Sequence, residues 1–402
     1  MNNTNIDFLI VGAGLFGATC ARILTDAGYN CLVIDKRDHI GGLCYTEKHE
    51  SGLYDIHKYG PHIFHTSYYD VAQFITNYTK FNSYRHEIMA CDGEHIYNLP
   101  FNMNTFNQLF GVIKPNEAKK IIDKEIKEAK LLFGDTDNLE AVAQTLVGKT
   151  IFEKLIKEYT EKQWNRKCYE LPGDIIKRLP IRYSFNNDYY NDIFCGIPKN
   201  GYTEVIHNIL NGKAFDNKLH NKISYMCGID FLQDKERWIS MSKYGVIYCG
   251  SVDELLDYEL GDLDWRSLEF KEFSYEYNGY NGQGCSSVNY VTKKYPYTRC
   301  IEHMYFNEEK WAPVIKSINS FESICTEEYP KDYKRGDERY YPINDDKNNN
   351  LYESYKKLLL ERYPNIVLGG RLGLYKYLDM DDTIKEAIII SNTLLNFINE
   401  GH

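Results

Sequence analysis

Three glycines and one acid near the start of the chain have the types and spacing of a phosphate-binding turn. Gly12, Gly14 and Gly17 form the pattern G-x-G-x-x-G, and Asp35 follows further along. In such a turn the first glycine permits a tight bend, the second lets a pyrophosphate approach the backbone, and the third lets helix and strand pack closely. The helix N-terminus offers N–H groups to the phosphates, and the acid accepts a hydrogen bond from a ribose hydroxyl. We therefore predict a dinucleotide site.

The elements around these residues predict a β-α-β unit. Residues 8–11 and 31–34 are short apolar runs typical of buried strands, and residues 18–24 have helical spacing. Gly41 and Gly42 then predict a second close approach of the backbone, which a nicotinamide-only site does not require.

The far end of the chain repeats this theme. Residues 366–368 predict a strand, residues 369–371 a tight turn, and residues 380–397 a long helix. We therefore expect a discontinuous first domain whose two ends close over one long dinucleotide such as FAD.

Two further pairs of residues leave alternatives open. His62 and His65 have the H-x-x-H spacing of metal ligands, but no nearby cysteine or acid completes a set, so we expect no metal site. They are either packing histidines or histidines that line a ligand. Tyr159 and Trp164 end a predicted helix, and they either pack in a core or stack on a base.

One apparent nucleotide motif is rejected. Gly148, Lys149 and Thr150 resemble the end of a phosphate-binding loop for triphosphates, but Ala143 stands where an earlier glycine is required. No strand is predicted before them, so we interpret the segment as a junction between helices.

Composition limits the class of protein. The 402 residues carry a net charge of −10, which argues against nucleic acid as a partner. No apolar run approaches the roughly 20 residues of a membrane span, and the N-terminus has no signal-peptide pattern, so we expect a cytoplasmic protein. The 11 scattered cysteines are expected to be buried thiols in a reducing compartment.

The middle of the chain predicts helices followed by short strands. We expect a strand pair within 67–105, a helix at 116–132, a helix opened by a capping box at Asp137 and Glu140, and another opened at Thr150 and Glu153 and ending near residue 163. Further on we expect a helix from 203, short strands over 223–300 and 301–329, a solvated loop at 345–350, and a helix at 351–362.

Ten sequence blocks, in order along nearly the whole chain, resemble the UDP-galactopyranose mutases of the bacterial type. They are VGAGLFGA, IDKR-HIGG, IHKYGPHIFHT, NLPFNMNTF, YTEKQW, IKRLPIR, GIP-GYT, YPYTR-IEH, EEYP and GGRLGLYKYLDM. The resemblance implies a flavoprotein isomerase that interconverts UDP-galactopyranose and UDP-galactofuranose and requires reduced FAD. In that chemistry flavin N5 forms a covalent adduct with the sugar and displaces UDP.

The same resemblance implies roles for individual residues. Arg182 and Arg299 would clamp the diphosphate, since arginine offers bidentate, permanently charged donors. Arg182 would lie on a mobile loop at about 177–186. The other implied catalytic residues are His65, Tyr377 and Asp379. The implied substrate-binding residues are Tyr159, Trp164, Asn289, Tyr329, Arg85, His86 and Phe194. The implied cofactor-binding residues are Gly12, Gly14, Phe16, Gly17, Asp35, Lys36, Gly42, Leu43, Tyr59, His62, Arg371 and Met380.

Three departures from the family pattern leave the sugar open. Leu43 and Cys44 replace the usual continuation of HIGG, Phe194 stands where a tyrosine hydroxyl is expected, and Arg85-His86 replaces a Thr-Asn pair. UDP-galactose remains the expected substrate. A deoxy, heptose or N-acetyl sugar, or a thymidine nucleotide, is the alternative, with the N-acetyl sugar ranked below galactose. An oxidase of the flavin amine-oxidase type, a nicotinamide-dependent dehydrogenase and a non-catalytic nucleotide-sugar binder are the competing functions.

The expected architecture is therefore α/β, with a discontinuous Rossmann-like FAD-binding domain, a helical bundle and an antiparallel sheet. The expected bounds are 1–80, 200–250 and 330–402 for the FAD domain, 105–175 for the bundle, and 81–104, 176–199 and 251–329 for the sheet domain. The resemblance also implies a homodimer and a place in polysaccharide biosynthesis.

Overall fold

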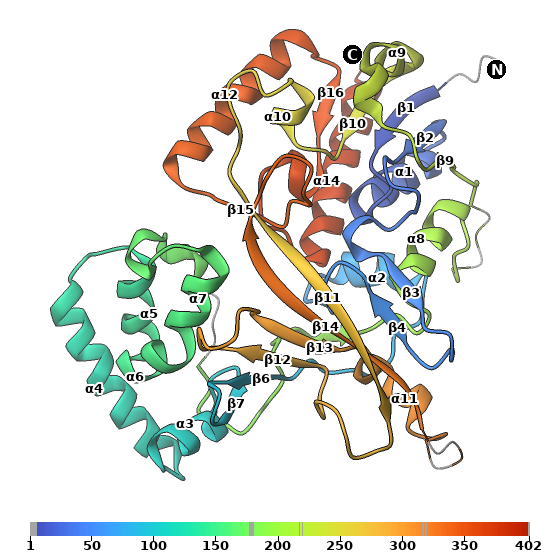
Figure 1. The fold of residues 1–402 in the computed structure, drawn as a ribbon. Coiled ribbons are helices and arrows are strands. Elements are labelled where there is room, and N and C mark those ends of the chain that lie inside the picture. The colour runs from blue at the N-terminus through green and yellow to red at the C-terminus, as the bar shows by residue number, and fades with distance from the viewer. Residues whose placement is uncertain are drawn as a thin grey trace. The chain divides into compact units, whose positions relative to one another are not determined.

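The computed structural model describes residues 6–176, 181–216, 218, 220–315, 317 and 320–400. These residues form two compact units (Figure 1). The first unit takes the described residues of 1–83, 192–265 and 341–402, and the second takes those of 84–191 and 266–340. The helices and the larger sheet predicted for the middle of the chain thus lie together in the second unit.

A parallel sheet forms the centre of the first unit, with the strand order β16-β10-β1-β2-β9. Its strands are β1 (Ile6–Val11), β2 (Cys31–Ile34), β9 (Ser224–Met226), β10 (Ser242–Tyr248) and β16 (Ile366–Leu368). Leu9 and Ile10 are fully buried, as expected for a strand that is covered on both faces. Because three separate segments supply the strands, the predicted discontinuous Rossmann-like domain is confirmed.

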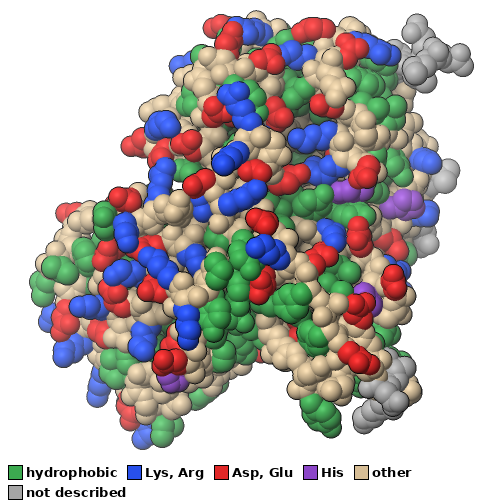
Figure 2. Space-filling view, viewed as in Figure 1, with side chains coloured by type: hydrophobic (Ala, Val, Ile, Leu, Met, Phe, Trp, Pro, Cys, Tyr) green, Lys and Arg blue, Asp and Glu red, His purple; other side chains and the backbone are tan. Residues whose placement is uncertain are grey.

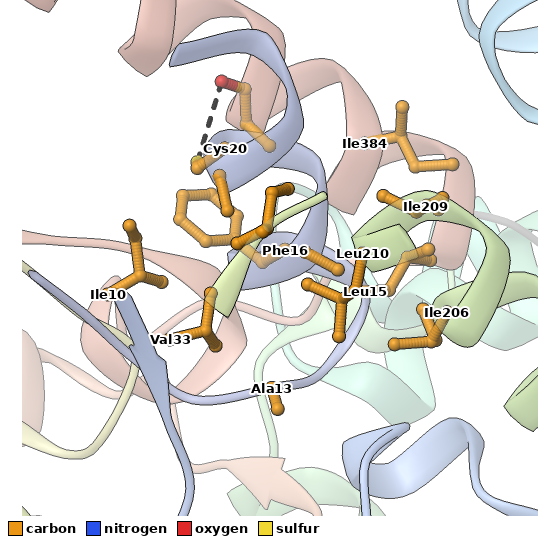
Figure 3. Close-up of a cluster of buried hydrophobic side chains, with 14 of the residues drawn as sticks. Ile10, Ala13, Leu15, Phe16, Cys20, Val33, Ile206, Ile209, Leu210 and Ile384 are labelled. Carbon is orange, nitrogen blue, oxygen red and sulfur yellow. Dashed lines mark hydrogen bonds between the residues drawn. The ribbon is translucent and has the colours of Figure 1, made fainter. Parts of the chain in front are cut away.

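Helices cover this sheet and form the core with it. They are α1 (Leu15–Asp26), α2 (Tyr69–Thr76), α8 (Tyr202–Asn211), α9 (Lys235–Met241), α10 (Val252–Leu255), α12 (Asp346–Arg362), α13 (Gly370–Gly373) and α14 (Met380–Asn399). Figure 3 shows α1, α8 and α14 contributing side chains to one cluster with the strands, among them Leu15, Phe16, Ile209, Leu210, Ile384, Ile10 and Val33.

Two short strand pairs complete the first unit. β3 (Thr46–Lys48) pairs with β4 (Asp55–His57), and β5 (Phe64–Thr66) pairs with β8 (Phe194–Gly196), both antiparallel. The two-residue strand β15 (Tyr341–Pro342) also belongs to this unit.

The second unit contains a sheet in the order β11-β14-β13-β12-β6-β7. The strands are β6 (Ile88–Cys91), β7 (Ile96–Leu99), β11 (Trp265–Tyr277), β12 (Ser287–Tyr290), β13 (Arg299–Glu302) and β14 (Phe321–Asp332). The pairs are antiparallel except for β6 and β12, which run parallel. The long strands β11 and β14 pair along their full length.

The helices of the second unit are α3 (Met103–Phe110), α4 (Pro115–Phe133), α5 (Leu139–Val147), α6 (Lys149–Ile151), α7 (Lys157–Trp164) and α11 (Glu308–Trp311). A π-helical turn at Phe152–Ile156 joins α6 to α7, so the predicted third helix is continuous. The helix predicted at 116–132 is confirmed by α4. Glu125 of α4 accepts hydrogen bonds from the Thr150 backbone N–H (2.8 Å) and hydroxyl (2.6 Å), which confirms the helix junction predicted there.

Five predictions about secondary structure are wrong. Asn138, not Asp137, caps α5, and Thr150 lies inside a helix that follows Gly148. Residues 345–350 are not a loop, because the Asp345 side chain caps α12 and the helix continues from the next residue. Helix α2 lies in the stretch expected to hold only strands, and α9 interrupts the strands expected over 223–300.

Charged side chains of both signs are interspersed over the visible surface (Figure 2). Across the described ranges, every helix is too short or too polar to span a bilayer. All 11 cysteines are free, but five are buried and six are partly exposed, so the expectation of buried thiols holds for only five of them.

Candidate active site

Close backbone packing surrounds the glycine turn of the first unit. Gly12 has a φ of +121°, and a Cβ added to Gly17 would lie 2.0 Å from the Gly12 carbonyl oxygen. Gly14 forms a bridge with Gly41, and a Cβ on Gly42 would lie 3.1 Å from the Gly14 Cα. The two glycine segments therefore pack directly on each other, and the second close approach to a cofactor stays a prediction.

Asp35 lies at the end of β2 beside this turn. Its carboxylate accepts hydrogen bonds from the backbone N–H of Ala13 (2.7 Å) and of Arg37 (2.9 Å), and the side chain is almost fully buried. A carboxylate has about four acceptor positions, so these bonds leave capacity for a ribose hydroxyl. The neighbouring Lys36 is exposed, with its Nζ 4.0 Å from Glu254.

The turn at residues 369–371 packs against α1, the helix that follows the glycine turn. A Cβ added to Gly369 would lie 2.2 Å from the Phe16 ring, so the buried Phe16 side chain is packed against this glycine. Its predicted contact with a cofactor could then come only from its backbone. Arg371 follows in α13, with its guanidinium 6.0 Å from the centre of the Tyr377 ring. Tyr377 is 39% exposed and stacks on Tyr341.

His62 has an environment that keeps it neutral. Its Nδ1 lies 2.9 Å from the Gly60 carbonyl oxygen. Burial lowers the pKa of His62 to about 4, and the positive charge of Arg371 contributes to the same shift. Tyr59 lies nearby in the sequence, and its hydroxyl is 2.9 Å from His39 Nε2. Leu43 lies in the short 3₁₀ turn Gly42–Cys44.

His65 and the start of α14 form an acidic cluster. The His65 Nδ1 lies 2.8 Å from an Asp192 carboxylate oxygen, and the Ser67 hydroxyl donates to the other oxygen at 2.6 Å. Asp379 is the N-cap residue of α14, and Met380 begins the helix and packs against the core of the unit. Burial raises the pKa of both Asp381 and Asp382 in the first turn.

The geometry of the glycine turn fits a dinucleotide cofactor. Gly14 is the N-cap of α1 and offers no side-chain cap, so the first turn of the helix presents backbone N–H groups without a side-chain acceptor from that residue. A Cβ on Gly14 would meet only ordinary contacts, the nearest at 3.7 Å. Gly17 is thus required by packing inside the protein, whereas Gly14 leaves open backbone of the kind a pyrophosphate approaches.

An arginine with two side-chain partners lies on the sheet of the second unit. Arg299 begins β13 and is paired in register with Asn289 of β12, and its Nε donates to the Asn289 side-chain oxygen at 3.1 Å. The Glu328 carboxylate on the neighbouring strand β14 lies 3.7 Å from the same nitrogen. Burial raises the pKa of Glu328, and the charge of Arg299 opposes this shift. Arg299 itself is 23% exposed, so a fixed cation reaches the surface there.

Tyr329 is the next residue on β14. Its hydroxyl donates to Glu327 at 2.6 Å, and the Lys271 ammonium lies 4.1 Å from the centre of its ring. The hydrogen bond to Glu327 raises the pKa of Tyr329 to about 12, so the phenol remains a donor at neutral pH.

The two aromatic residues of α7 pack partly on the core. Tyr159 and Trp164 are half-buried and lie against a hydrophobic cluster that includes Leu155 and Val291. The two alternatives for these rings are therefore compatible, because one face of each can pack while the rest stays accessible for stacking.

Arg182, Arg85 and His86 converge on one segment, residues 188–191. Arg182 donates to the backbone oxygens of Asp188 and Tyr189 and to the Asn191 side chain.

Arg85 binds the same segment from another side. Two of its three guanidinium nitrogens donate to the Asp188 carboxylate, at 2.7 and 3.2 Å. The buried His86 accepts a bond from the Tyr189 backbone N–H on its carbonyl oxygen, at 2.7 Å, and its ring stacks on Tyr190. These residues thus organise a loop in the structure, and residues 177–180 of the predicted mobile loop lie outside the described residues.

Phe194 lies on β8 of the first unit. Its ring packs edge-on against Phe64 and Phe81. Phe194 is therefore part of an aromatic cluster of the first unit.

Sequence reasoning missed several residues of these arrangements. Glu328 and Asp192 orient Arg299 and His65, and Lys162 of α7 holds the connection between β12 and β13. The signal for Glu328 was strand alternation in EEYP, which turns one of two adjacent glutamates inward. For Lys162 it was the row Glu158, Glu161 and Lys162 on one helix face.

Comparisons with known proteins agree with this arrangement. A family model described as UDP-galactopyranose mutase matches residues 154–377, more than half of the chain, and a model for NAD(P)-binding Rossmann-like domains matches residues 10–78.

Two full-length relatives are equally similar to the chain. It is 36% identical to the dTDP-fucopyranose mutase of Escherichia coli, over 94% of this chain and 96% of that protein. It is also 36% identical to a probable UDP-galactopyranose mutase of Klebsiella pneumoniae, over 99% of this chain and 96% of that protein. A crystal structure of reduced UDP-galactopyranose mutase matches the fold with a TM-score of 0.66 and 16% identity, over 98% of this chain and 96% of that one. The chain therefore belongs to the UDP-galactopyranose mutase family.

Proposed function

We propose that this protein is an isomerase that interconverts UDP-galactopyranose and UDP-galactofuranose and works with reduced FAD. The observation that carries the proposal is the fixed, surface-reaching guanidinium of Arg299, held by Asn289 and Glu328 in a chain of this family. Such a pre-oriented cation suits a diphosphate that must leave the sugar and return to it.

The first unit would hold the flavin. The backbone around Gly14 and Gly42 would bind the pyrophosphate of FAD, and Asp35 would bind its ribose. The isoalloxazine ring would lie near His62, Arg371 and the start of α14. When bound and reduced, the flavin supplies a nucleophile for the anomeric carbon of the sugar. A neutral His62 adds no positive charge beside it.

The second unit would bind the nucleotide. Tyr159 would stack on the base, and Arg299 would neutralise the diphosphate. The Tyr329 phenol would donate a hydrogen bond to the diphosphate by exchanging its present bond to Glu327 for it. Arg182 would reach phosphate oxygens only by exchanging its present bonds to residues 188–191 for them. We propose that the loop that carries Arg182 rearranges around the substrate when these bonds are exchanged.

A thymidine-linked 6-deoxy sugar is the second candidate substrate. The full-length relative that acts on dTDP-fucopyranose is as similar to the chain as the probable UDP-galactopyranose mutase. The apolar setting of Phe194 and the cation at Arg85 favour a changed sugar site as well.

The test is a substrate panel. The purified holoprotein is reduced with dithionite and incubated with UDP-galactose, dTDP-fucose, UDP-N-acetylgalactosamine and a UDP-heptose, each as pyranose and furanose where obtainable, and the products are separated by chromatography. We expect interconversion of one pair, with no turnover in the oxidised control. A reduced, flavin-loaded protein that converts none of them contradicts the proposal, and substrate-dependent oxygen consumption by the oxidised protein would support the amine-oxidase type instead.

We also propose a cytoplasmic homodimer that serves polysaccharide biosynthesis. Eleven cysteines without a disulfide suit a reducing compartment. Ile113, Leu131 and Leu132, at and near α4, are each more than 70% exposed, which is typical of a surface that a second copy covers. Light scattering of the protein, with Leu131→Glu as the disrupting variant, tests the dimer. The three-domain division remains a proposal, with the bounds stated from the sequence.

A further inference from the structure

The connection between β12 and β13 joins the two residues that orient the proposed diphosphate site. β12 carries Asn289, β13 begins at Arg299, and residues 291–298 run between them. Three tyrosine rings pack together in this segment. The Tyr290 ring contacts the Tyr295 ring edge-on, with centroids 4.8 Å apart, and the Tyr297 ring edge-on, with centroids 4.7 Å apart. This connection therefore links the two strands that carry Asn289 and Arg299.

One side chain from α7 holds this loop together. The Lys162 Nζ donates to the carbonyl oxygens of Tyr290 (2.8 Å), Thr292 (3.0 Å), Tyr295 (3.0 Å) and Tyr297 (2.7 Å). Four carbonyl dipoles from both arms of the loop thus point at one ammonium group. An ammonium has three N–H bonds, so at least one of them is shared between two oxygens.

Two acids on the same face of α7 bind the middle of the loop. Glu158 accepts a hydrogen bond from the Lys293 backbone N–H at 2.7 Å, and the largely buried Glu161 pairs with the Lys293 ammonium. Glu158, Glu161 and Lys162 are spaced as neighbours on one side of a helix. Burial lowers the pKa of Lys162 to about 8, whereas the charge of Glu158 opposes this shift.

The same helix carries Tyr159 three residues before Lys162, so it joins the proposed base-stacking ring to the loop that leads into Arg299. We propose that Lys162 is a positioning residue for nucleotide binding, whose ammonium gathers the carbonyls of residues 290–297 and thereby sets Asn289 and Arg299 for the diphosphate. This inference rests on the proposed function for its ligand and on the loop geometry for its mechanism.

The test uses the full-length flavin-loaded protein and two methionine variants. Lys162→Met keeps the length and apolar stem of the side chain and removes the ammonium. Lys157→Met is the matched control, because Lys157 lies on the same helix and its Nζ binds the partly exposed Glu153, with the centre of the Phe152 ring 5.9 Å away. Hydrogen exchange followed by mass spectrometry reports the loop, and calorimetric titration with UDP, and separately with dTDP, reports nucleotide affinity.

We expect Lys162→Met to speed exchange of the 290–298 amides on the order of 10-fold or more, while β11 and β14 keep their protection. The Kd for the nucleotide should rise on the order of 10-fold with an unchanged flavin content, and the control should match the wild type. Wild-type exchange and affinity in Lys162→Met would overturn the inference, as would a loss of protection spread evenly over the sheet.

A second variant covers the case in which Lys162→Met does not fold. Lys162→Arg retains the charge, but its planar fork cannot converge on four oxygens around one point. We expect the same local rise in exchange and a smaller loss of affinity, and wild-type behaviour would overturn the inference. If the wild type binds neither UDP nor dTDP, the proposed function fails, and the exchange of residues 290–298 still decides whether Lys162 sets the loop.

Discussion

Asn289 and Arg299 are directly paired across β12 and β13, and the Asn289 side-chain oxygen accepts a hydrogen bond from the Arg299 Nε at 3.1 Å. The buried Glu328 carboxylate lies 3.7 Å from the same Arg299 Nε, so both partners contact this one nitrogen of the guanidinium. The orientation of the arginine is therefore set before any substrate arrives, which is the arrangement that favours a charge present in the transition state.

Removing this guanidinium should impair catalysis more than folding. For Arg299→Ala we expect kcat/KM to fall on the order of 10²-fold or more, equivalent to about 2.7 kcal/mol of transition-state binding. Arg299→Lys should recover only part of the loss, because an ammonium cannot form bidentate bonds to phosphate. Steady-state kinetics of the reduced holoenzyme measure both, with Lys334→Ala on an exposed turn as the control. Near-wild-type turnover in Arg299→Ala would exclude this residue from the diphosphate site.

Glu328→Gln should stabilise the protein and weaken nucleotide binding. Because burial raises the pKa of Glu328, the folded state keeps its proton in a pH range where the unfolded chain has released it. Stability contributed by this group therefore falls as the pH rises above the ordinary glutamate value, because ionising the buried carboxylate costs free energy.

The neutral amide removes that cost. We expect the Tm of Glu328→Gln at pH 7 to rise by about 2 °C, and the difference to shrink toward pH 4. The Kd for UDP or dTDP should increase several-fold, since Arg299 loses its charged partner. Thermal scans across this pH range measure the first effect, with the exposed Glu269→Gln as the control. A variant with lower Tm and unchanged affinity would show that Glu328 serves stability alone.

His62 should make the flavin-free protein sensitive to acid. The pKa of His62 is about 4 in the folded state and 6.5 in the unfolded chain. Between these two pH values the unfolded chain therefore binds a proton that the folded chain does not bind. Stability contributed by His62 is complete above pH 6.5 and is lost as the pH falls toward 4. We expect His62→Gln to flatten this part of the pH–Tm profile, whereas the exposed His95→Gln leaves it unchanged. An identical profile in the wild type and in His62→Gln would contradict the prediction.

Two glycines of the first turn should respond differently to the same substitution. In Gly17→Ala the new methyl would overlap the Gly12 carbonyl oxygen, so we expect a loss of more than about 2 kcal/mol of stability. Gly14→Ala meets only ordinary contacts, and it should leave the Tm of the flavin-free protein within a few degrees while raising the Kd for FAD on the order of 10-fold. Denaturation curves and flavin titration separate the two effects. Normal FAD affinity in a folded Gly14→Ala protein would remove the pyrophosphate from this position.

Local patterns predicted the first unit well, because its determinants are close in sequence. The apolar runs and glycines before Asp35 specify β1, α1 and β2 by period and by steric need. The stretch 345–350 was mispredicted because its polar composition outweighed the one cap, Asp345, that starts α12.

The contacts of the candidate site were harder to predict. The carbonyl oxygens around Lys162 belong to residues that are between 128 and 135 positions further along the chain. No local sequence pattern predicts which oxygens Lys162 contacts. Arg299 and Asn289 were found by family resemblance. Glu328 was missed because alternation in EEYP shows only that one of the two glutamates turns inward, and the neighbouring strands decide which one is buried.

The strand order of the parallel sheet has a consequence for synthesis on the ribosome. β1 leaves the exit tunnel first, yet its neighbour β10 begins at Ser242 and the edge strand β16 at Ile366. The nascent chain must therefore carry β1 with one side unpaired until most of the polypeptide has been translated. An apolar strand with an unpaired edge is prone to aggregate. We therefore expect the amount of folded protein to depend on the chaperones that are present during translation.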